Sequence, residues 1–227
     1  MSAAELVMLS VLGALLGLDV VSFPQAMFSR PLVAATAAGA ALGNPALGLT
    51  AGAVLELIAL DTLPVGASRY PEWGSASVVG GALFATFGNA PAGALVLAVT
   101  GALATAWAGG WTMFALRQLN GQWARRALPA LDAGSPHAVM GLQMLGMTAD
   151  LMRGGLLTLV ALLVLVPVAA RLVLHWHAGD LVSHMMVVAC AVAVAISAMW
   201  KLVHGATHAK WFALAGLLVG LIAVRSR

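Results

Sequence analysis

No charged residue occurs between Trp73 and Leu116, a stretch of 44 residues that reads WGSASVVGGALFATFGNAPAGALVLAVTGALATAWAGGWTMFAL. An α-helix rises about 1.5 Å per residue, so the stretch is too long for one crossing of a bilayer, which takes about 20 residues. Its middle is interrupted by Gly88-Asn-Ala-Pro91. Glycine and asparagine tolerate positive φ, and proline ends the preceding helix. The stretch therefore predicts two helices joined by a tight turn at membrane depth.

A second uncharged stretch has the same character. Pro31–Leu55 is interrupted by Gly43-Asn-Pro45, so it too predicts short helices around a turn. The units 39–56 and 81–107 resemble each other, which fits either an internal hairpin repeat or the low-complexity Ala/Gly composition. Glycines spaced four apart (39 and 43, 48 and 52) predict close helix packing, because apolar side chains gain little by leaving lipid for protein.

The composition of the whole chain fixes its class. Of 227 residues, 62% are hydrophobic and 8% are charged, and the mean hydropathy is +0.99. A soluble domain carries about 25% charged residues, so a soluble enzyme and a disordered protein are both excluded. The net charge of +3 comes without a run of basic residues, which argues against binding of nucleic acid.

The sequence has one cysteine, Cys190, so it can form no internal disulfide and no Cys/His metal site, and we expect no cofactor. We predict an all-α, multi-pass membrane protein.

Three regions follow from the spacing of charges. Residues 1–116 hold the short, broken and re-entrant helices, and we expect the substrate site there, because interrupted segments mark the binding sites of transporters. Residues 117–136 form a polar connection with three arginines, which the positive-inside rule predicts to be cytoplasmic. Residues 137–227 predict an amphipathic helix followed by plainer transmembrane helices.

Charged and polar residues inside the first region are the candidate site. A charge at the bilayer centre costs about 2.5–3.5 kcal/mol, so it persists where it pairs or handles a polar substrate. Glu56 follows 25 uncharged residues, and its carboxylate can accept hydrogen bonds from sugar hydroxyls. The alternative is an ion pair with Arg30 or Arg69 that fixes the helices. Asp19 and Gln25 are further candidates, because they follow the first helix in an irregular stretch.

The segment 64–74 predicts irregular backbone at membrane depth, which is tolerated where it lines a cavity. Ser68 and Glu72 supply polar groups to it, and Arg69 supplies a charge. Tyr70 and Trp73 either stack on a sugar face or anchor the chain at the membrane interface.

Five ordered motifs in this region resemble the IIC membrane component of the mannose/sorbose-type enzyme II of the bacterial sugar phosphotransferase system. They are Gly17-Leu-Asp19, Ser29-Arg-Pro-Leu-Val-Ala34, Leu42-Gly-Asn-Pro-Ala-Leu-Gly-Leu49, Gly52-Ala-Val-Leu-Glu-Leu57 and Leu63-Pro-Val-Gly-Ala67. The family's usual Val-Pro-Pro-Asp segment is replaced here by Arg69-Tyr-Pro-Glu72. The resemblance is dense over residues 17–80 and compatible to about residue 205.

The resemblance implies a role and a set of partners. Such IIC components lie in the bacterial inner membrane with a second membrane component, IID, as multimers, and bind a hexose or amino sugar. Soluble phosphocarrier components, IIA and IIB, deliver the phosphoryl group, so a IIC component is not catalytic alone. The chain agrees in having no phosphate-binding GxxxxGK loop.

We therefore predict a sugar-translocating membrane component whose cavity is lined by Glu56, Gln25 and Asp19, with Ser68 and Glu72 as further contacts and Arg30 and Arg69 in ion-pair or structural roles. Two alternatives remain from the residues themselves. One is a scaffold or regulatory membrane component without transport. The other is an ion-coupled secondary transporter that uses the carboxylates for ions or protons.

Overall fold

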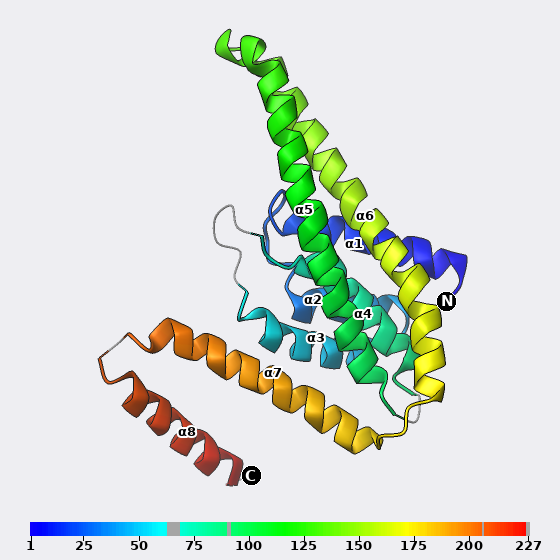
Figure 1. Ribbon diagram of the computed structural model, residues 1–227, viewed down its shortest axis with the longest axis vertical. Coiled ribbons are helices and arrows are strands. Elements are labelled where there is room, and N and C mark those ends of the chain that lie inside the picture. The colour runs from blue at the N-terminus through cyan, green and yellow to red at the C-terminus, as the bar shows by residue number, and fades with distance from the viewer. Residues whose placement is uncertain (63–68, 90–91, 206, 226–227) are drawn as a thin grey trace.

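The computed structural model describes residues 1–62, 69–89, 92–205 and 207–225, and in these residues the chain forms eight α-helices (Figure 1). They are α1 (Ala3–Asp19), α2 (Pro31–Ala41), α3 (Pro45–Ala59), α4 (Trp73–Phe87), α5 (Ala94–Asp132), α6 (Pro136–Leu174), α7 (Asp180–Val203) and α8 (Ala209–Arg225). The prediction of an all-α protein with short helices early and longer ones later is confirmed.

Both predicted breaks fall between helices. The Gly43-Asn44-Pro45 turn joins α2 to α3: Gly43 takes φ of +78°, and the proline occupies the first turn of α3, where its missing N–H costs no hydrogen bond. The second break separates α4, which ends at Phe87, from α5, which begins at Ala94. Ala90 and Pro91 lie outside the described residues.

Glycines let the short helices approach one another closely. A Cβ atom on Gly48 of α3 would lie 2.4 Å from the carbonyl oxygen of Ala35 in α2 and 2.9 Å from Cα of Gly39. A Cβ atom on Gly81 of α4 would meet the same carbonyl oxygen at 2.4 Å. The expected close packing of helices at small residues is therefore found at Gly39, Gly48 and Gly81, whereas Gly43 forms the turn.

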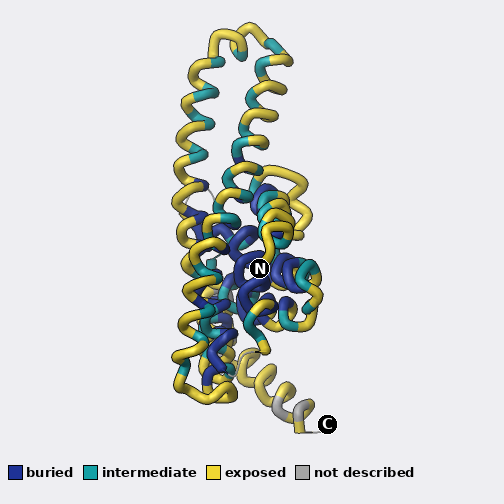
Figure 2. The backbone as a smooth tube through the Cα atoms, turned by 90° about the vertical axis from the view of Figure 1, so that its right-hand side faces the viewer, coloured by how far each residue is buried: buried dark blue, intermediate teal, exposed yellow. Residues whose placement is uncertain are grey.

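Helix α4 is the centre of the molecule. Its residues from Gly74 to Ala85 are all buried, and it packs against α1, α2, α3, α5 and α6. The dark buried segments gather in the middle of the tube in Figure 2, between the tall α5–α6 hairpin and the N-terminal helices. An apolar helix buried on all sides forms the core around which the irregular segments are arranged.

The predicted polar connection 117–136 differs from a loop. Helix α5 continues through it to Asp132, and only Ala133–Ser135 turn the chain into α6. The amphipathic segment from 137 and the apolar segment from 154 are likewise one helix of 39 residues. The Asn120-Gly121 pair and Pro129 lie inside α5 without ending it, so the polar sequence extends the helix.

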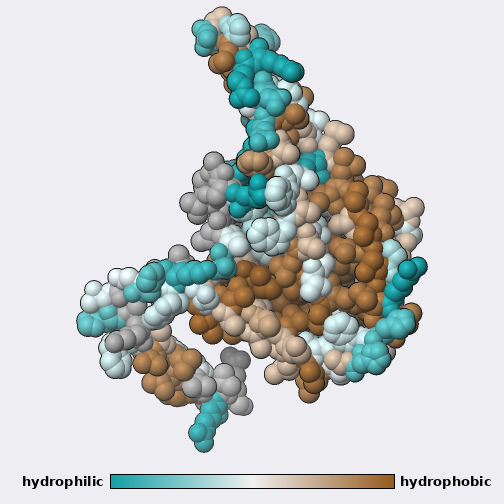
Figure 3. Space-filling model, in the orientation of Figure 1, coloured by the Kyte–Doolittle hydropathy of each residue, from teal (hydrophilic) through white to brown (hydrophobic). Residues whose placement is uncertain are grey.

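The α5–α6 hairpin is longer than a bilayer is thick. Each helix has 39 residues, about 58 Å at the rise of an α-helix, against about 30 Å of hydrocarbon. The excess forms an arm that rises above the other helices, and its tip carries most of the hydrophilic surface in the upper part of Figure 3. We call residues 117–153 the polar arm.

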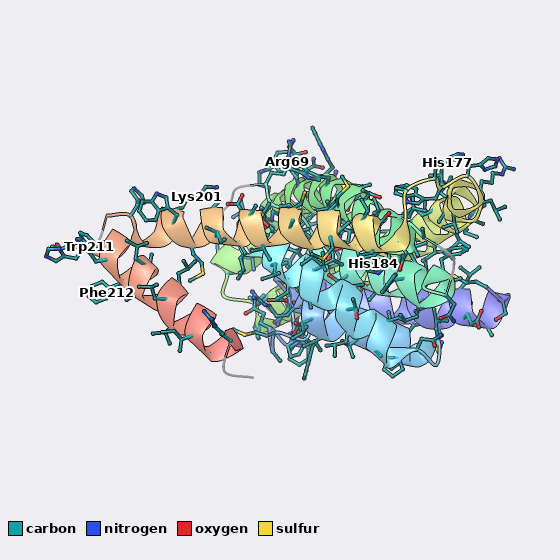
Figure 4. All side chains as sticks on the ribbon, turned by 90° about the horizontal axis from the view of Figure 1, so that it is seen from below. Arg69, His177, His184, Lys201, Trp211 and Phe212 are labelled. Carbon is teal, nitrogen blue, oxygen red and sulfur yellow. The ribbon has the colours of Figure 1, made fainter. Side chains whose placement is uncertain are left out.

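The C-terminal helices lie along the opposite end of the molecule. Helix α7 packs against α3 and α5, and the ammonium group of Lys201 bonds Asp61 at 2.5 Å, just beyond the end of α3. His184 lies over α4, with its ring 6.0 Å from that of Phe84, while Trp211 and Phe212 on α8 project away from the body (Figure 4). Among the described residues, three helices are long and apolar enough to span a membrane: Ala94–Asp132, Pro136–Leu174 and Asp180–Lys201.

Candidate functional site

The loop between α1 and α2 is organised by Asp19. This buried residue ends α1, and its two carboxylate oxygens accept backbone N–H groups of Ala26 at 2.7 Å and Ser29 at 2.8 Å. Gln25 and Met27 take left-handed conformations, with φ of 58° and 64°. Such conformations are rare outside glycine and persist where the surroundings hold them, often at ligand sites.

A cavity of about 390 Å³ and another of about 330 Å³ lie on either side of this loop. The smaller one extends between the loop and the ends of α3 and α4. Two of the predicted sugar-site residues, Asp19 and Gln25, line it together, and Ser29, Arg30, Thr62 and Trp73 complete its polar and aromatic lining. We call this the loop cavity.

The aromatic wall of the loop cavity is fixed in place. Trp73 begins α4, and its indole N–H donates to the hydroxyl of Thr62 at 3.0 Å. The hydrogen bond ties the start of α4 to the chain that follows α3 and holds the indole ring at the cavity. The sequence left Trp73 open between a stacking residue and an interface anchor, and its position at the cavity favours stacking.

Glu56 lies behind the cavity. Its carboxylate pairs with the guanidinium of Arg30, and Oε2 accepts the backbone N–H of Leu32 at 3.1 Å, at the start of α2. Arg30 lines the loop cavity, whereas Glu56 is not among its lining residues. The arrangement is the ion pair that the sequence left as the alternative for Glu56, and a direct sugar contact by this carboxylate stays a prediction.

Neither Glu72 nor Arg69 is among the residues that line the loop cavity. Glu72 is completely buried, caps α4 through the backbone N–H of Ser75 at 3.1 Å and packs against Gly109 of α5. Arg69 stacks over the ring of Trp111, with 3.6 Å from its guanidinium carbon to the ring centroid. Ser68 lies outside the described residues.

Sequence reasoning missed a second polar cluster. Asp150 on α6 is buried and accepts hydrogen bonds from Arg153 Nε at 2.8 Å and from the hydroxyl of Ser22 at 2.5 Å. Nearby, an Arg117 guanidinium nitrogen donates to the hydroxyl of Tyr70 at 2.5 Å. The sequence contains a signal for this cluster: Asp150 and Arg153 lie three residues apart among apolar neighbours, and this spacing places both side chains on one face of a helix.

Comparison with known proteins gives the chain its family. The family described as "PTS system sorbose-specific iic component" matches residues 3–216. "Fructose permease IIC component" of Bacillus subtilis (strain 168) is 32% identical over 124 residues, which are 53% of this chain and 46% of that protein. The chain thus matches about half the length of this curated relative.

Two solved structures share the fold. "Structure of membrane protein" superposes with a TM-score of 0.77 at 20% identity, over 100% of this chain and 93% of the other. "CryoEM Structure of Mannose Transporter ManYZ and Microcin E492 (MceA) complex" superposes with a TM-score of 0.62 at 19% identity, over 99% of this chain and 96% of that one. The matching family covers nearly all of the eight-helix fold, and this chain belongs to the sorbose-type IIC family of phosphotransferase-system membrane components.

Proposed function

We propose that the chain is the sugar-translocating IIC component of a phosphotransferase-system permease of the mannose/sorbose type, and that it binds a hexose or an amino sugar. The matched family is described as sorbose-specific, the B. subtilis relative as a fructose permease, and one structure of the same fold as a mannose transporter. All three names refer to hexoses, which supports this class of substrate.

The observation that carries the proposal is the loop cavity. It collects a carboxylate, an amide, a guanidinium, two hydroxyls and an indole from three separated segments of the chain. Ligand sites of proteins occupy about 300–1,000 Å³, so a cavity of about 330 Å³ suits a single small ring. Paired hydroxyls of a pyranose suit charged, multidentate partners, and an indole provides a flat apolar wall.

Each residue then has a distinct role. Gln25 and Arg30 contact hydroxyls directly, and Asp19 holds the loop and offers its remaining lone pairs to the sugar. Glu56 orients Arg30. Glu72 and Ser68 remain proposed contacts; the buried Glu72 would reach the sugar only when α4 and α5 separate during transport.

The proposal includes the partners that the family implies. A IID membrane component completes the translocating unit in the bacterial inner membrane. Soluble IIA and IIB components supply the phosphoryl group, so the IIC component performs no phosphoryl transfer itself. One structure of the same fold carries the name of a two-part transporter, ManYZ, which supports a second membrane component.

The test is hexose binding to the complex copurified with the IID component, measured for a panel of hexoses and amino sugars. We expect Gln25→Leu to weaken binding about fivefold, which corresponds to about 1 kcal/mol for one hydrogen bond. The matched control is Gln118→Leu, the same substitution at an exposed position of α5. Absence of binding to every sugar in the panel, or equal affinities for the two variants, would refute the assignment.

The energy source separates this function from an ion-coupled transporter. Uptake by a phosphotransferase permease draws on a phosphoryl donor, so dissipating the proton gradient in cells that retain the donor should leave uptake unchanged. Loss of uptake on dissipation would instead favour the secondary transporter.

A further inference from the structure

The larger cavity, of about 390 Å³, shares the loop between α1 and α2 with the loop cavity. Asp19, Val20 and Gln25 line one side of the loop, and Val21 and Ser22 line the other. The far wall of the larger cavity is the base of the polar arm, where α5 and α6 face each other. We call it the arm cavity.

The lining of the arm cavity has the chemistry of a carbohydrate site. Its polar side chains are two amides, one carboxylate, one guanidinium and one hydroxyl beside an indole: Asn120, Gln143, Asp150, Arg117, Ser22 and Trp123. Planar hydrogen-bonding groups beside an aromatic face match a polyol ring, which has hydroxyls at its edge and an apolar face.

Two buried polar groups belong to this lining. Asp150 is 2% exposed, and Arg153 and Ser22 hold its carboxylate in one orientation at the cavity. The side-chain oxygen of Asn120 is buried and accepts no hydrogen bond from any described residue. Buried polar atoms are nearly always satisfied, so a sugar hydroxyl that displaced a neighbouring side chain would find an acceptor in this oxygen.

We propose that the arm cavity is a second monosaccharide subsite, occupied by the unphosphorylated sugar after it leaves the loop cavity. The inference rests on the proposed function and extends it to the route of the sugar. The arm carries Arg117, Arg125 and Arg126 and is predicted to be cytoplasmic, so the second subsite lies on the side where phosphorylation follows.

The hydrogen bond between Ser22 and Asp150 ties the loop to the arm cavity. A sugar that enters this cavity can replace the serine hydroxyl at the carboxylate, because both are hydroxyl donors. The exchange removes one hydrogen bond between the loop and α6 while the buried carboxylate stays satisfied.

The experiment uses the full chain in complex with the IID component and two readouts. One is equilibrium binding of the hexose, and the other is its uptake into vesicles charged with the IIA and IIB components and a phosphoryl donor. Asn120→Leu and Gln143→Leu test the arm cavity, Gln25→Leu tests the loop cavity, and the exposed Gln118→Leu is the control. Trp123→Phe retains an aromatic ring but removes the indole that reports on the arm cavity, so the hexose-induced change in tryptophan fluorescence should be smaller in this variant.

We expect both arm-cavity variants to slow uptake about five- to tenfold, the effect of about 1–1.4 kcal/mol, while Gln118→Leu transports normally. Gln25→Leu should weaken binding but leave the Trp123 signal intact at saturating sugar.

Three results would overturn the subsite. The first is a combination: Gln25→Leu loses hexose binding, both arm-cavity variants take up the sugar normally, and Trp123→Phe shows an unchanged fluorescence response. This combination would overturn the subsite and leave the proposed function intact. A Trp123 response to hexose 6-phosphate but not to the hexose would assign the cavity to the product. Failure of the unsubstituted complex to bind any hexose would overturn the proposed function and the subsite together.

Discussion

The tight contact between α2 and α4 makes a quantitative prediction for Gly81→Ala. The added Cβ would lie 2.4 Å from the carbonyl oxygen of Ala35, 2.7 Å from its Cα and 2.9 Å from its carbonyl carbon. Ordinary contact begins at 3.4 Å, so the two helices must separate by 1.0 Å (3.4 minus 2.4). All three opposing atoms belong to the backbone, so no side-chain rotation can relieve the clash.

Overpacking of a well-packed interior costs about 1–3 kcal/mol, and a clash of backbone with backbone belongs at the upper end. Alanine favours a helix over glycine by about 1 kcal/mol. Gly81→Ala should therefore lower the free energy of unfolding by about 2 kcal/mol, which raises the unfolded fraction roughly 30-fold.

The control is Gly141→Ala in α6, where an added Cβ meets no atom within 4 Å. Its helix propensity gain is the same, so the difference between the two variants isolates the steric cost of about 3 kcal/mol. Unfolding in detergent micelles, followed by tryptophan fluorescence against denaturant, measures both. An unfolding midpoint for Gly81→Ala equal to or above that of Gly141→Ala would refute the packing described here.

Two further predictions test the polar contacts. Asp150→Asn leaves the Arg153 guanidinium buried without its counterion and should lower the free energy of unfolding by about 3 kcal/mol, whereas Asp132→Asn at an exposed position should change it by less than about 0.5 kcal/mol; equal melting temperatures would contradict the buried pair. If Glu56 acts only by orienting Arg30, Glu56→Gln should weaken sugar binding by no more than Arg30→Gln does. In a double-mutant cycle the double variant should then bind no more weakly than Arg30→Gln alone, whereas a larger loss in Glu56→Gln than in Arg30→Gln would mean that the Glu56 carboxylate touches the sugar.

The membrane class and the interrupted helices could be predicted from local sequence. Low charge and long apolar stretches exclude a water-exposed fold, and Gly43-Asn-Pro45 carries its own turn geometry in the φ preferences of its residues. The family motifs of the first 80 residues pointed to the sorbose-type IIC family, which the match over residues 3–216 confirms. These features depend on residues close together in the chain.

Polarity misled the prediction of the 117–136 connection. The segment is polar and helical at once, because polarity alone does not interrupt a helix. Helix α5 stops at Asp132, where Gly134 in the left-handed conformation permits the turn, and a proline-led α6 begins. Length and breaker residues, more than charge, set the ends of these helices.

The sequence by itself determined that this chain is a helical membrane protein and where its early helices break. It also determined which polar residues lie within apolar segments and therefore require a partner or a polar ligand. Only the tertiary structure decided what those residues meet. It paired Glu56 with Arg30 across α2 and α3, turned Asp19 toward the backbone of its own loop, and brought Asp150 to Ser22, 128 positions away in the chain. The partner of a charge depends on how helices cross, and helix crossing is set by glycine contacts between segments that no local pattern relates.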